Sequence, residues 1–175
     1  MTGRRSIHRG RVVDLGIETV RRPDGRTLEL EVVRHPGGAA VVALDAGRNV
    51  CLVRQYRHAT GGWLWELPAG KLEPDEPPLA TARRELGEEA GLRARYWRAL
   101  GSVLSTPGFC DEVIHLYLAR GLTTVATEHQ EDELMEVHWL SYAEALRQAL
   151  DGRLRDAKTI IGLLRARPLL DGRGD

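Results

Sequence analysis

The amino-acid sequence predicts a mixed α/β (α+β) fold preceded by an antiparallel β-hairpin. Three observations predict it: alternating apolar runs around a turn sequence near the N-terminus, short continuous apolar runs after it, and amphipathic segments of helical period. A length of 175 residues is typical of one domain with its own hydrophobic core. No internal repeat or low-complexity segment interrupts this pattern.

The N-terminal region predicts a half-exposed hairpin. Runs at 11–20 and 26–35 flank the turn sequence Arg22-Pro23-Asp24-Gly25, and apolar residues alternate through the second run. The sequence His35-Pro36-Gly37-Gly38 then breaks the chain. We therefore expect two parts, a β-hairpin or sheet over residues 1–36 and the main domain over residues 37–175.

The main domain is predicted to alternate strands and helices. Residues 39–45 and 49–57 are continuous apolar runs that indicate buried strands, and 59–65 is predicted as a loop. Apolar residues recur at helical spacing in 77–90, with Pro77 or Pro78 suited to the first turn and Gly91 to the end. Further strands are expected at 96–105, 112–122 and 135–141, and closing helices at 141–152 and 156–168, the first capped by Ser141.

Composition limits the partners that the chain can take. Lys plus Arg and Asp plus Glu are equal at 25 each, so no global charge attracts nucleic acid or an anionic membrane. The two cysteines are far apart and form no CxxC pair, which argues against a disulfide framework or a zinc ribbon. The basic N-terminus lacks the apolar run of a signal peptide, and no stretch has the length of a membrane span. We expect a cytoplasmic protein that binds neither nucleic acid nor membrane.

The predicted helix at 77–90 concentrates carboxylates beside its apolar face. With Leu86 at zero on the helical wheel, Glu89 falls about 60° and Glu85 about 100° to the same side. Like charges at this spacing repel, and partial burial strengthens the repulsion. A divalent cation between the two carboxylates would turn this repulsion into a net attraction. Carboxylate oxygens suit Mg²⁺ or Mn²⁺ better than zinc. Charge alone favours a solvated helix face, with Arg84 and Glu88 as an ordinary i,i+4 pair.

The spacing of the segment favours the metal site. Gly70, five residues, Glu76, seven residues and then Arg84-Glu85-Leu86-Gly87-Glu88-Glu89-Ala90-Gly91-Leu92 match every fixed position of the Nudix box. The chain therefore resembles the Nudix hydrolase superfamily from about Ala39 to Leu164. This resemblance implies the Nudix fold, a mixed β-sheet sandwiched between helices, with residues 37–175 as the catalytic domain.

The resemblance also implies a metal-assisted attack of water on a diphosphate. It assigns Glu85 and Glu89 to the metal, which is Mg²⁺ with Mn²⁺ as a substitute, and places Glu88 beside them as ligand or water-orienting group. It further assigns the carbonyl of Ala69 as a metal ligand, and Arg84 as the link between loop and helix through Glu76.

Residues outside the box suggest a substrate. Pro107 lies fifteen residues after Leu92, as a proline does in the ADP-ribose pyrophosphatase group. The stretches at 105–112, 54–57 and 66–70 also resemble that group. The resemblance implies substrate contacts by Arg57 with the diphosphate and by Glu112 with the terminal ribose. It also implies that Pro107 and Gly108, in the same loop as Glu112, bind the substrate. Four aromatic residues are candidates to stack on adenine, although such residues are more often core or loop anchors: Tyr56, Trp63, Trp65 and Phe109.

An acidic loop before the last predicted strand completes the implied site. Alignment on that strand gives Glu131 as the base for the attacking water and Glu133 as an additional metal ligand, the alternative being a solvated acidic loop. The N-terminal strands resemble those that relatives exchange in a homodimer. The leading prediction is thus a Mg²⁺-dependent ADP-ribose or nucleotide-sugar pyrophosphatase that yields AMP and a sugar phosphate. Alternatives are another substrate, such as GDP-mannose, FAD or another dinucleotide, or an ADP-ribose sensor without activity.

Overall fold

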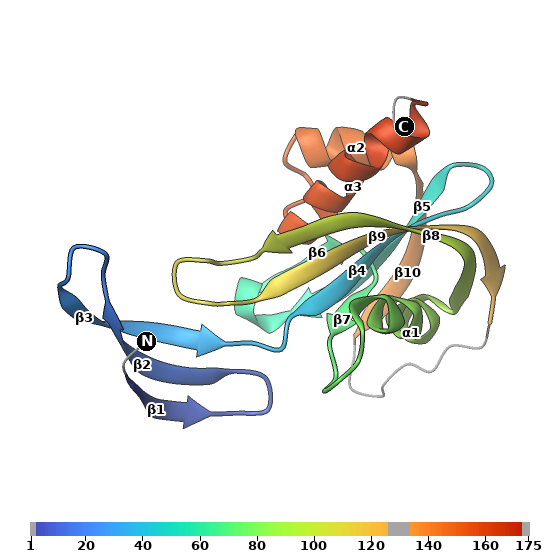
Figure 1. The fold of residues 1–175 in the computed structure, drawn as a ribbon. Helices are drawn as coiled ribbons and strands as arrows, with labels where there is room; N and C mark the ends of the chain where they lie inside the picture. The colour runs from blue at the N-terminus through green and yellow to red at the C-terminus, as the bar shows by residue number, and fades with distance from the viewer. Residues whose placement is uncertain (1–2, 126–133, 173–175) are drawn as a thin grey trace.

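The computed structural model of the chain describes residues 3–125 and 134–172. A small N-terminal sheet extends to one side of a larger body, in which a mixed sheet lies between helices on both faces (Figure 1). The mixed sheet between helices agrees with the fold predicted from the sequence.

The N-terminal sheet has three antiparallel strands in the order β1-β2-β3. They are β1 (Gly3–Arg9), β2 (Asp14–Arg21) and β3 (Thr27–Arg34). The hairpin of β2 and β3 agrees with the prediction, whereas β1 was not predicted. Its sequence GRRSIHR has no apolar alternation and its residues are mostly exposed, so the ladder to β2 is what shows it as a strand.

The central sheet runs β10-β5-β4-β9-β8, with β6 paired to β5 and β7 paired to β4. Its strands are β4 (Gly38–Leu44), β5 (Asn49–Arg57), β6 (Gly62–Glu66), β7 (Ala69–Lys71), β8 (Leu92–Leu104), β9 (Val113–Thr124) and β10 (Met135–Ser141). The ladder of β4 with β9 is parallel, and the other ladders are antiparallel. The prediction of a loop over 59–65 was wrong in its second half, because Gly62–Glu66 pairs with β5 through its backbone. A short 3₁₀ turn, η1 (His58–Thr60), precedes it.

Strand β4 explains why the core has two layers. All seven of its residues are buried, as expected for a strand that is covered on both faces. Ala39, Val41 and Ala43 pack in the cluster beneath α1, whereas Ala40, Val42 and Leu44 pack in the cluster beneath the closing helices. The helices are α1 (Pro78–Ala90) on one face and α2 (Tyr142–Leu150) and α3 (Ala157–Leu170) on the other.

The helix ends follow the signals read from the sequence. Gly91 ends α1 in the left-handed conformation, at a φ of 63°, and its N–H bonds back into the last turn of the helix. Ser141 caps α2 by accepting a hydrogen bond from the N–H of Glu144 at 3.3 Å. No helix in the described part of the chain is long and apolar enough to cross a membrane.

Candidate metal and diphosphate site

Helix α1 presents carboxylates on the face that it turns toward the sheet. Ala82 and Leu86 on this face are fully buried, and Glu85 and Glu89 beside them are only 9% and 7% exposed. Buried carboxylates are unfavourable unless they bind hydrogen-bond donors or cations. The burial of these two side chains therefore requires donors or cations beside them.

Strand β7, which precedes α1, lies directly against these carboxylates. Oε2 of Glu89 accepts a hydrogen bond from the N–H of Ala69 at 2.8 Å. A Cβ built on Gly70 would lie only 1.8 Å from Oε1 of Glu85, so the backbone at Gly70 and the carboxylate are in close contact. This approach requires glycine for lack of space. The predicted metal ligands Ala69, Glu85 and Glu89 are thus neighbours.

Arg84 connects the loop to the helix. Its Nε and Nη2 donate to both carboxylate oxygens of Glu76, at 3.1 and 3.0 Å, and Nη2 also donates to the carbonyl of Lys71. Its Nη1 donates to Glu85 at 2.7 Å and to Glu88 at 3.0 Å. The hydrogen bonds from Arg84 lower the pKa of Glu76 to about 2. Glu76 is therefore ionised at neutral pH, as this pairing requires.

The donor chemistry of this cluster fits a hard divalent cation. Carboxylate and carbonyl oxygens are the ligands that Mg²⁺ and Mn²⁺ take in proteins. Within residues 3–125 and 134–172, no three His, Cys, Asp or Glu side chains converge on one point as a formed metal site. In this arrangement Arg84 holds Glu85 and Glu88. The remaining predicted members, Glu131 and Glu133, lie outside the described residues.

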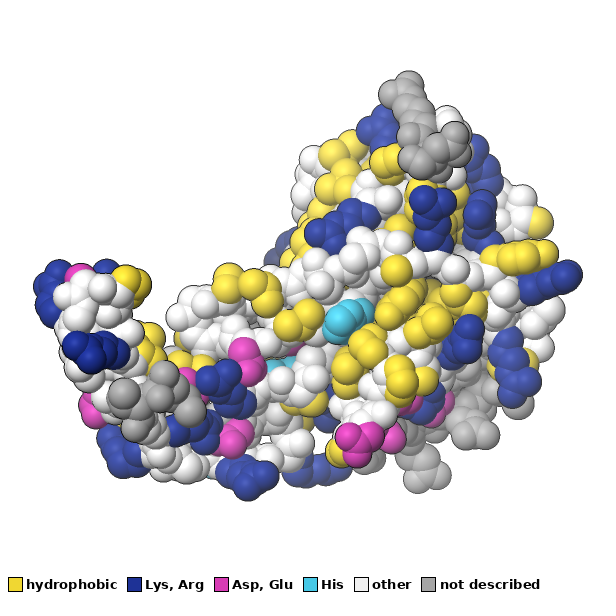
Figure 2. Space-filling view, in the orientation of Figure 1, with side chains coloured by type: hydrophobic (Ala, Val, Ile, Leu, Met, Phe, Trp, Pro, Cys, Tyr) yellow, Lys and Arg dark blue, Asp and Glu magenta, His cyan; other side chains and the backbone are white. Residues whose placement is uncertain are grey.

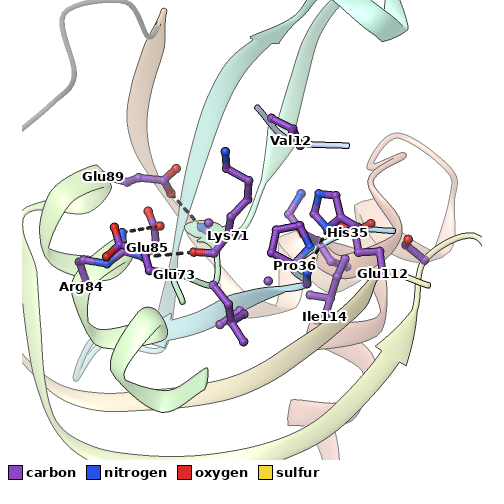
Figure 3. Close-up of a pocket in the computed structure, with 18 of the residues that line it drawn as sticks. Val12, His35, Pro36, Lys71, Glu73, Arg84, Glu85, Glu89, Glu112 and Ile114 are labelled. Atoms are coloured by element: carbon purple, nitrogen blue, oxygen red, sulfur yellow. Dashed lines mark hydrogen bonds and ion pairs between the residues drawn. The ribbon is translucent and has the colours of Figure 1, made fainter. Parts of the chain in front are cut away.

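The α1 carboxylates form one wall of a cavity of about 1130 Å³. Figure 3 shows Glu85 and Glu89 on one side, His35 and Glu112 on the opposite side, and Lys71 between them. Arginine and lysine side chains from several elements also line it. Figure 2 shows side chains of both charges on the surface where the N-terminal sheet joins the body. The cavity thus combines carboxylates at one end with cations along its walls, which suits a polyanion bound through a metal.

The opposite wall is held by the N-terminal sheet. The N–H of Val33 donates to the carbonyl of Phe109 at 2.7 Å, and the N–H of Asp111 donates to the carbonyl of Val33 at 3.2 Å. The side chain of Asp111 accepts from the N–H of His35 at 2.8 Å, and Nδ1 of His35 lies 3.3 Å from Oε1 of Glu112. Glu112 therefore faces the cavity on a loop fixed to β3.

Not every predicted substrate residue reaches the cavity. Ser105 and Glu112 are the described members of the loop at 105–112 that line it, so Pro107 and Gly108 lie on the loop but not at the cavity wall. Their turn positions this loop, since the N–H of Phe109 and of Cys110 donate to the carbonyl of Thr106. The four aromatic candidates likewise do not line it, and Trp65 packs against the core under α2 and α3.

Arg57 lines the cavity from the end of β5. Its Nε and Nη2 donate to the two oxygens of Glu66, at 2.8 and 2.9 Å, so one edge of the guanidinium is held by the protein. Sequence reasoning missed Glu66, Lys158, His35 and Gln55 as residues near the site. Two of these residues could have been found from the sequence. Gln55 lies in the RQYR stretch, and Lys158 lies in the first turn of a helix, where a cation is unfavourable and therefore needs a reason.

Comparison with known proteins assigns the chain to a family. A family model for the NUDIX domain matches residues 34–161. An ADP-ribose pyrophosphatase of Mycobacterium tuberculosis is 42% identical over 95% of this chain and 82% of its own length. A methanol dehydrogenase activator of Bacillus methanolicus is 42% identical over 90% of this chain and 86% of its own length. A GDP-mannose pyrophosphatase of Klebsiella pneumoniae is 34% identical over 88% of this chain and 84% of its own length.

A solved structure supports the fold. The crystal structure of an ADP compounds hydrolase superposes with a TM-score of 0.84 and covers 99% of this chain and 94% of its own, at 21% identity. The box glutamates, the loop packed against them and the family match over most of the sequence point to the same conclusion. The chain belongs to the Nudix hydrolase family, with ADP-ribose pyrophosphatases among its relatives.

Proposed function

We propose that the chain hydrolyses the diphosphate linkage of ADP-ribose or a closely related nucleotide sugar, with Mg²⁺ as cofactor and Mn²⁺ as a substitute. The products are AMP and a sugar phosphate. The observation that carries this proposal is one cavity with the box glutamates at one end and with Arg57 and Glu112 in its other walls. Its volume of about 1130 Å³ is slightly above the range of roughly 300 to 1,000 Å³ for small-molecule sites, which leaves room for a dinucleotide-sized substrate.

The metal end follows from the contacts of α1. Glu85, Glu89 and the carbonyl of Ala69 would hold the divalent cation, with Glu88 beside them. When bound, such an ion neutralises charge on phosphate oxygens and lowers the pKa of a bound water. Arg84 holds both Glu85 and Glu88 through one nitrogen, Nη1, with hydrogen bonds of 2.7 and 3.0 Å.

The roles of the other site residues are those that the resemblance to the ADP-ribose pyrophosphatase group implies. Arg57 binds the diphosphate through its guanidinium, whose fork matches phosphate oxygens. Glu112 accepts hydrogen bonds from hydroxyls of the terminal ribose. Glu131 takes the proton of the attacking water, and Glu133 is a further metal ligand.

A second candidate keeps the mechanism and changes the substrate. The similarity to a GDP-mannose pyrophosphatase at 34% identity favours a guanosine nucleotide sugar as the alternative. Base and sugar are read by side chains along the cavity wall, and the α1 carboxylates would serve both substrates in the same way.

The test is a substrate panel with purified protein and Mg²⁺. The panel holds ADP-ribose, ADP-glucose, GDP-mannose, FAD, NADH and diadenosine polyphosphates, with alkaline phosphatase added to release phosphate from monoester products. We expect Mg²⁺-dependent turnover with ADP-ribose preferred. Preference for GDP-mannose would support the second candidate instead. Binding of ADP-ribose without turnover of any substrate would contradict the enzymatic proposal.

A further inference from the structure

A buried carboxylate beside the cavity is shared by two cations from distant parts of the sequence. Glu66, the last residue of β6, is 2% exposed. It accepts two hydrogen bonds from Arg57 and forms an ion pair with Lys158, which lies 92 positions further along the sequence. Burial alone would raise the pKa of Glu66, but Arg57 and Lys158 hold it below its ordinary value. Glu66 is therefore a charged group in the protein interior.

Lys158 stands in a position that disfavours a cation. It belongs to the first turn of α3, where the helix dipole presents its positive end. Its Nζ lies 3.0 Å from Oδ1 of Asp156, which caps the same helix, and its side chain is 14% exposed. Glu66 and Asp156 together offset the unfavourable position.

The same helix end is tied to the loop that carries the metal-binding backbone. The N–H of Leu67 donates to Oγ1 of Thr159 at 2.8 Å. Two residues further, the N–H of Ala69 donates to Glu89. Arg57, Lys158, Ala69 and Glu89 all line the cavity. The N-terminus of α3 is thus connected to Arg57 through Glu66, and to the loop of Ala69 through Leu67.

Charge balance shows what Lys158 does there. Arg57, Lys158, Glu66 and Asp156 carry two positive and two negative charges, so the cluster is neutral. Without Lys158 the cluster is negative, and the charge of Glu66 is balanced by Arg57 alone. Arg57 then attracts phosphate less, because a fixed carboxylate and the ligand compete for one guanidinium.

We propose that Lys158 is a positioning residue which, through Glu66, keeps Arg57 available to the diphosphate of the substrate. This inference rests on the proposed function, because it takes Arg57 as a diphosphate-binding residue. Lys158 acts through Glu66 because its ammonium group is engaged by Glu66 and Asp156. It is distinct from the metal ligands and from the residues of the box.

The first variant is Lys158→Met, assayed with the best substrate of the panel. We expect KM to rise about tenfold and kcat to change less than about twofold, a coupling of ordinary size for neighbouring charges. Lys158→Arg should restore most of the affinity, since it keeps the charge next to Glu66. Arg167→Met is the matched control: it removes a cation from the exposed far end of the same helix and should leave KM unchanged.

A double-mutant cycle separates an indirect role from direct substrate contact. In an Arg57→Lys background, which loses the fork held by Glu66, we expect Lys158→Met to change KM less than about twofold. Additive effects would overturn the proposal in favour of direct contact. An unchanged KM in a folded Lys158→Met protein would also overturn it.

Folding and substrate identity are controlled separately. Lys158→Gln, which keeps a hydrogen-bond donor near Glu66, is the second variant if Lys158→Met does not fold. If neither folds, Lys158 serves stability and the proposal is wrong. If the wild type prefers a substrate other than ADP-ribose, the proposed substrate fails, but the effect of Lys158 on KM should persist because the diphosphate is common to the panel.

Discussion

The two most buried glutamates of α1 have different partners, although they lie one turn apart. Glu85 is bound by Arg84, whereas Glu89 accepts the backbone N–H of Ala69. The proposed divalent cation would compete with Arg84 for Glu85, and Arg84 would keep Glu76 as a partner. The backbone contact fixes Glu89 in place. At the residue scale, Glu85 is therefore held by a side chain and Glu89 by the backbone of the loop.

Replacing Glu89 by Gln tests the charge without losing the contact. The amide oxygen of Gln can still accept the N–H of Ala69, so we expect the fold to be kept. Loss of the carboxylate charge should reduce kcat about a thousandfold, since metal-assisted stabilisation of the transition state is worth several kcal/mol. Steady-state kinetics across a Mg²⁺ titration, with circular dichroism for the fold, measure this. Glu144→Gln on α2 is the control, and unchanged turnover of Glu89→Gln would remove Glu89 from the metal ligands.

The pairing of Glu76 with Arg84 predicts a pH dependence of stability. The pKa of Glu76 falls from 4.5 to about 2 in the folded chain, chiefly through hydrogen bonds from Arg84. Its contribution is fully present above pH 4.5 and is lost as the pH falls from about 4.5 to about 2, because the unfolded state takes up the proton first.

Denaturant unfolding of the wild type and of Glu76→Gln at several pH values measures this contribution. We expect the wild type to be more stable at pH 7 and the difference to shrink below pH 4.5. Glu29→Gln on β3, where the side chain is exposed, should show no such change with pH. A difference between wild type and Glu76→Gln that is equal at pH 7 and pH 3 would contradict the prediction.

At the scale of elements, the proposed metal site is built on the segment from β7 through its loop to α1. Packing of α1 on β4 and β7 brings Gly70 against Glu85. Helix α3 also packs closely on the other face, since a Cβ on Gly162 would lie 2.7 Å from Cδ1 of Leu67. Leu67 also bonds to Thr159, so α3 and α1 hold the two ends of one short segment.

Gly70→Ala should therefore disable the site with the strands still formed. The new methyl group would overlap the carboxyl group of Glu85, whose Cδ lies 2.0 Å from the Cβ position, so Glu85 must move away. We expect kcat to fall at least about a hundredfold, as for other displacements of about 1 Å in a catalytic group. Gly62→Ala on β6 is the matched control, because its Cβ meets nothing within 4 Å. Normal turnover of a folded Gly70→Ala protein would show that Glu85 need not stay where it is.

At the scale of the whole molecule, the N-terminal sheet stands away from the body and exposes apolar side chains (Figures 1 and 2). Ile7, Val12, Val13 and Leu30 are between 38% and 49% exposed. Ile7 and Leu30 lie on β1 and β3, and Val12 and Val13 lie in the segment between β1 and β2. Exposed apolar side chains such as these often mark an interface. We propose that this sheet joins two copies of the chain in a homodimer.

Light scattering should then give twice the chain mass of 19.5 kDa. Ile7→Glu on β1 should lower the dimer fraction, because it would bury a charge in the interface. Leu150→Glu at the end of α2, a more exposed leucine on the other side of the body, should not. A monomeric mass for the wild type at assay concentration would contradict the homodimer.

The sequence by itself determined the features that depend on local spacing. The Nudix box, the apolar runs of β4 and β5, and the start and end of α1 follow from residue types at fixed intervals, because helix periodicity, capping and buried-strand composition are local properties. Glu85, Glu89 and Arg84 were named as site residues for the same reason. The two-layer core could be expected from β4, whose apolar run leaves no polar face for solvent.

Only the tertiary structure decided which distant residues meet. Strand β1 has no apolar alternation and exists through its ladder with β2, so its own sequence gave no signal. Pro107 and Gly108 share a loop with Glu112, yet the turn directs Glu112 to the cavity and not them. The ion pair of Glu66 with Lys158 joins residues 92 positions apart. Such pairings are long-range, and their free energy depends on burial and charge balance that exist only after the chain has folded.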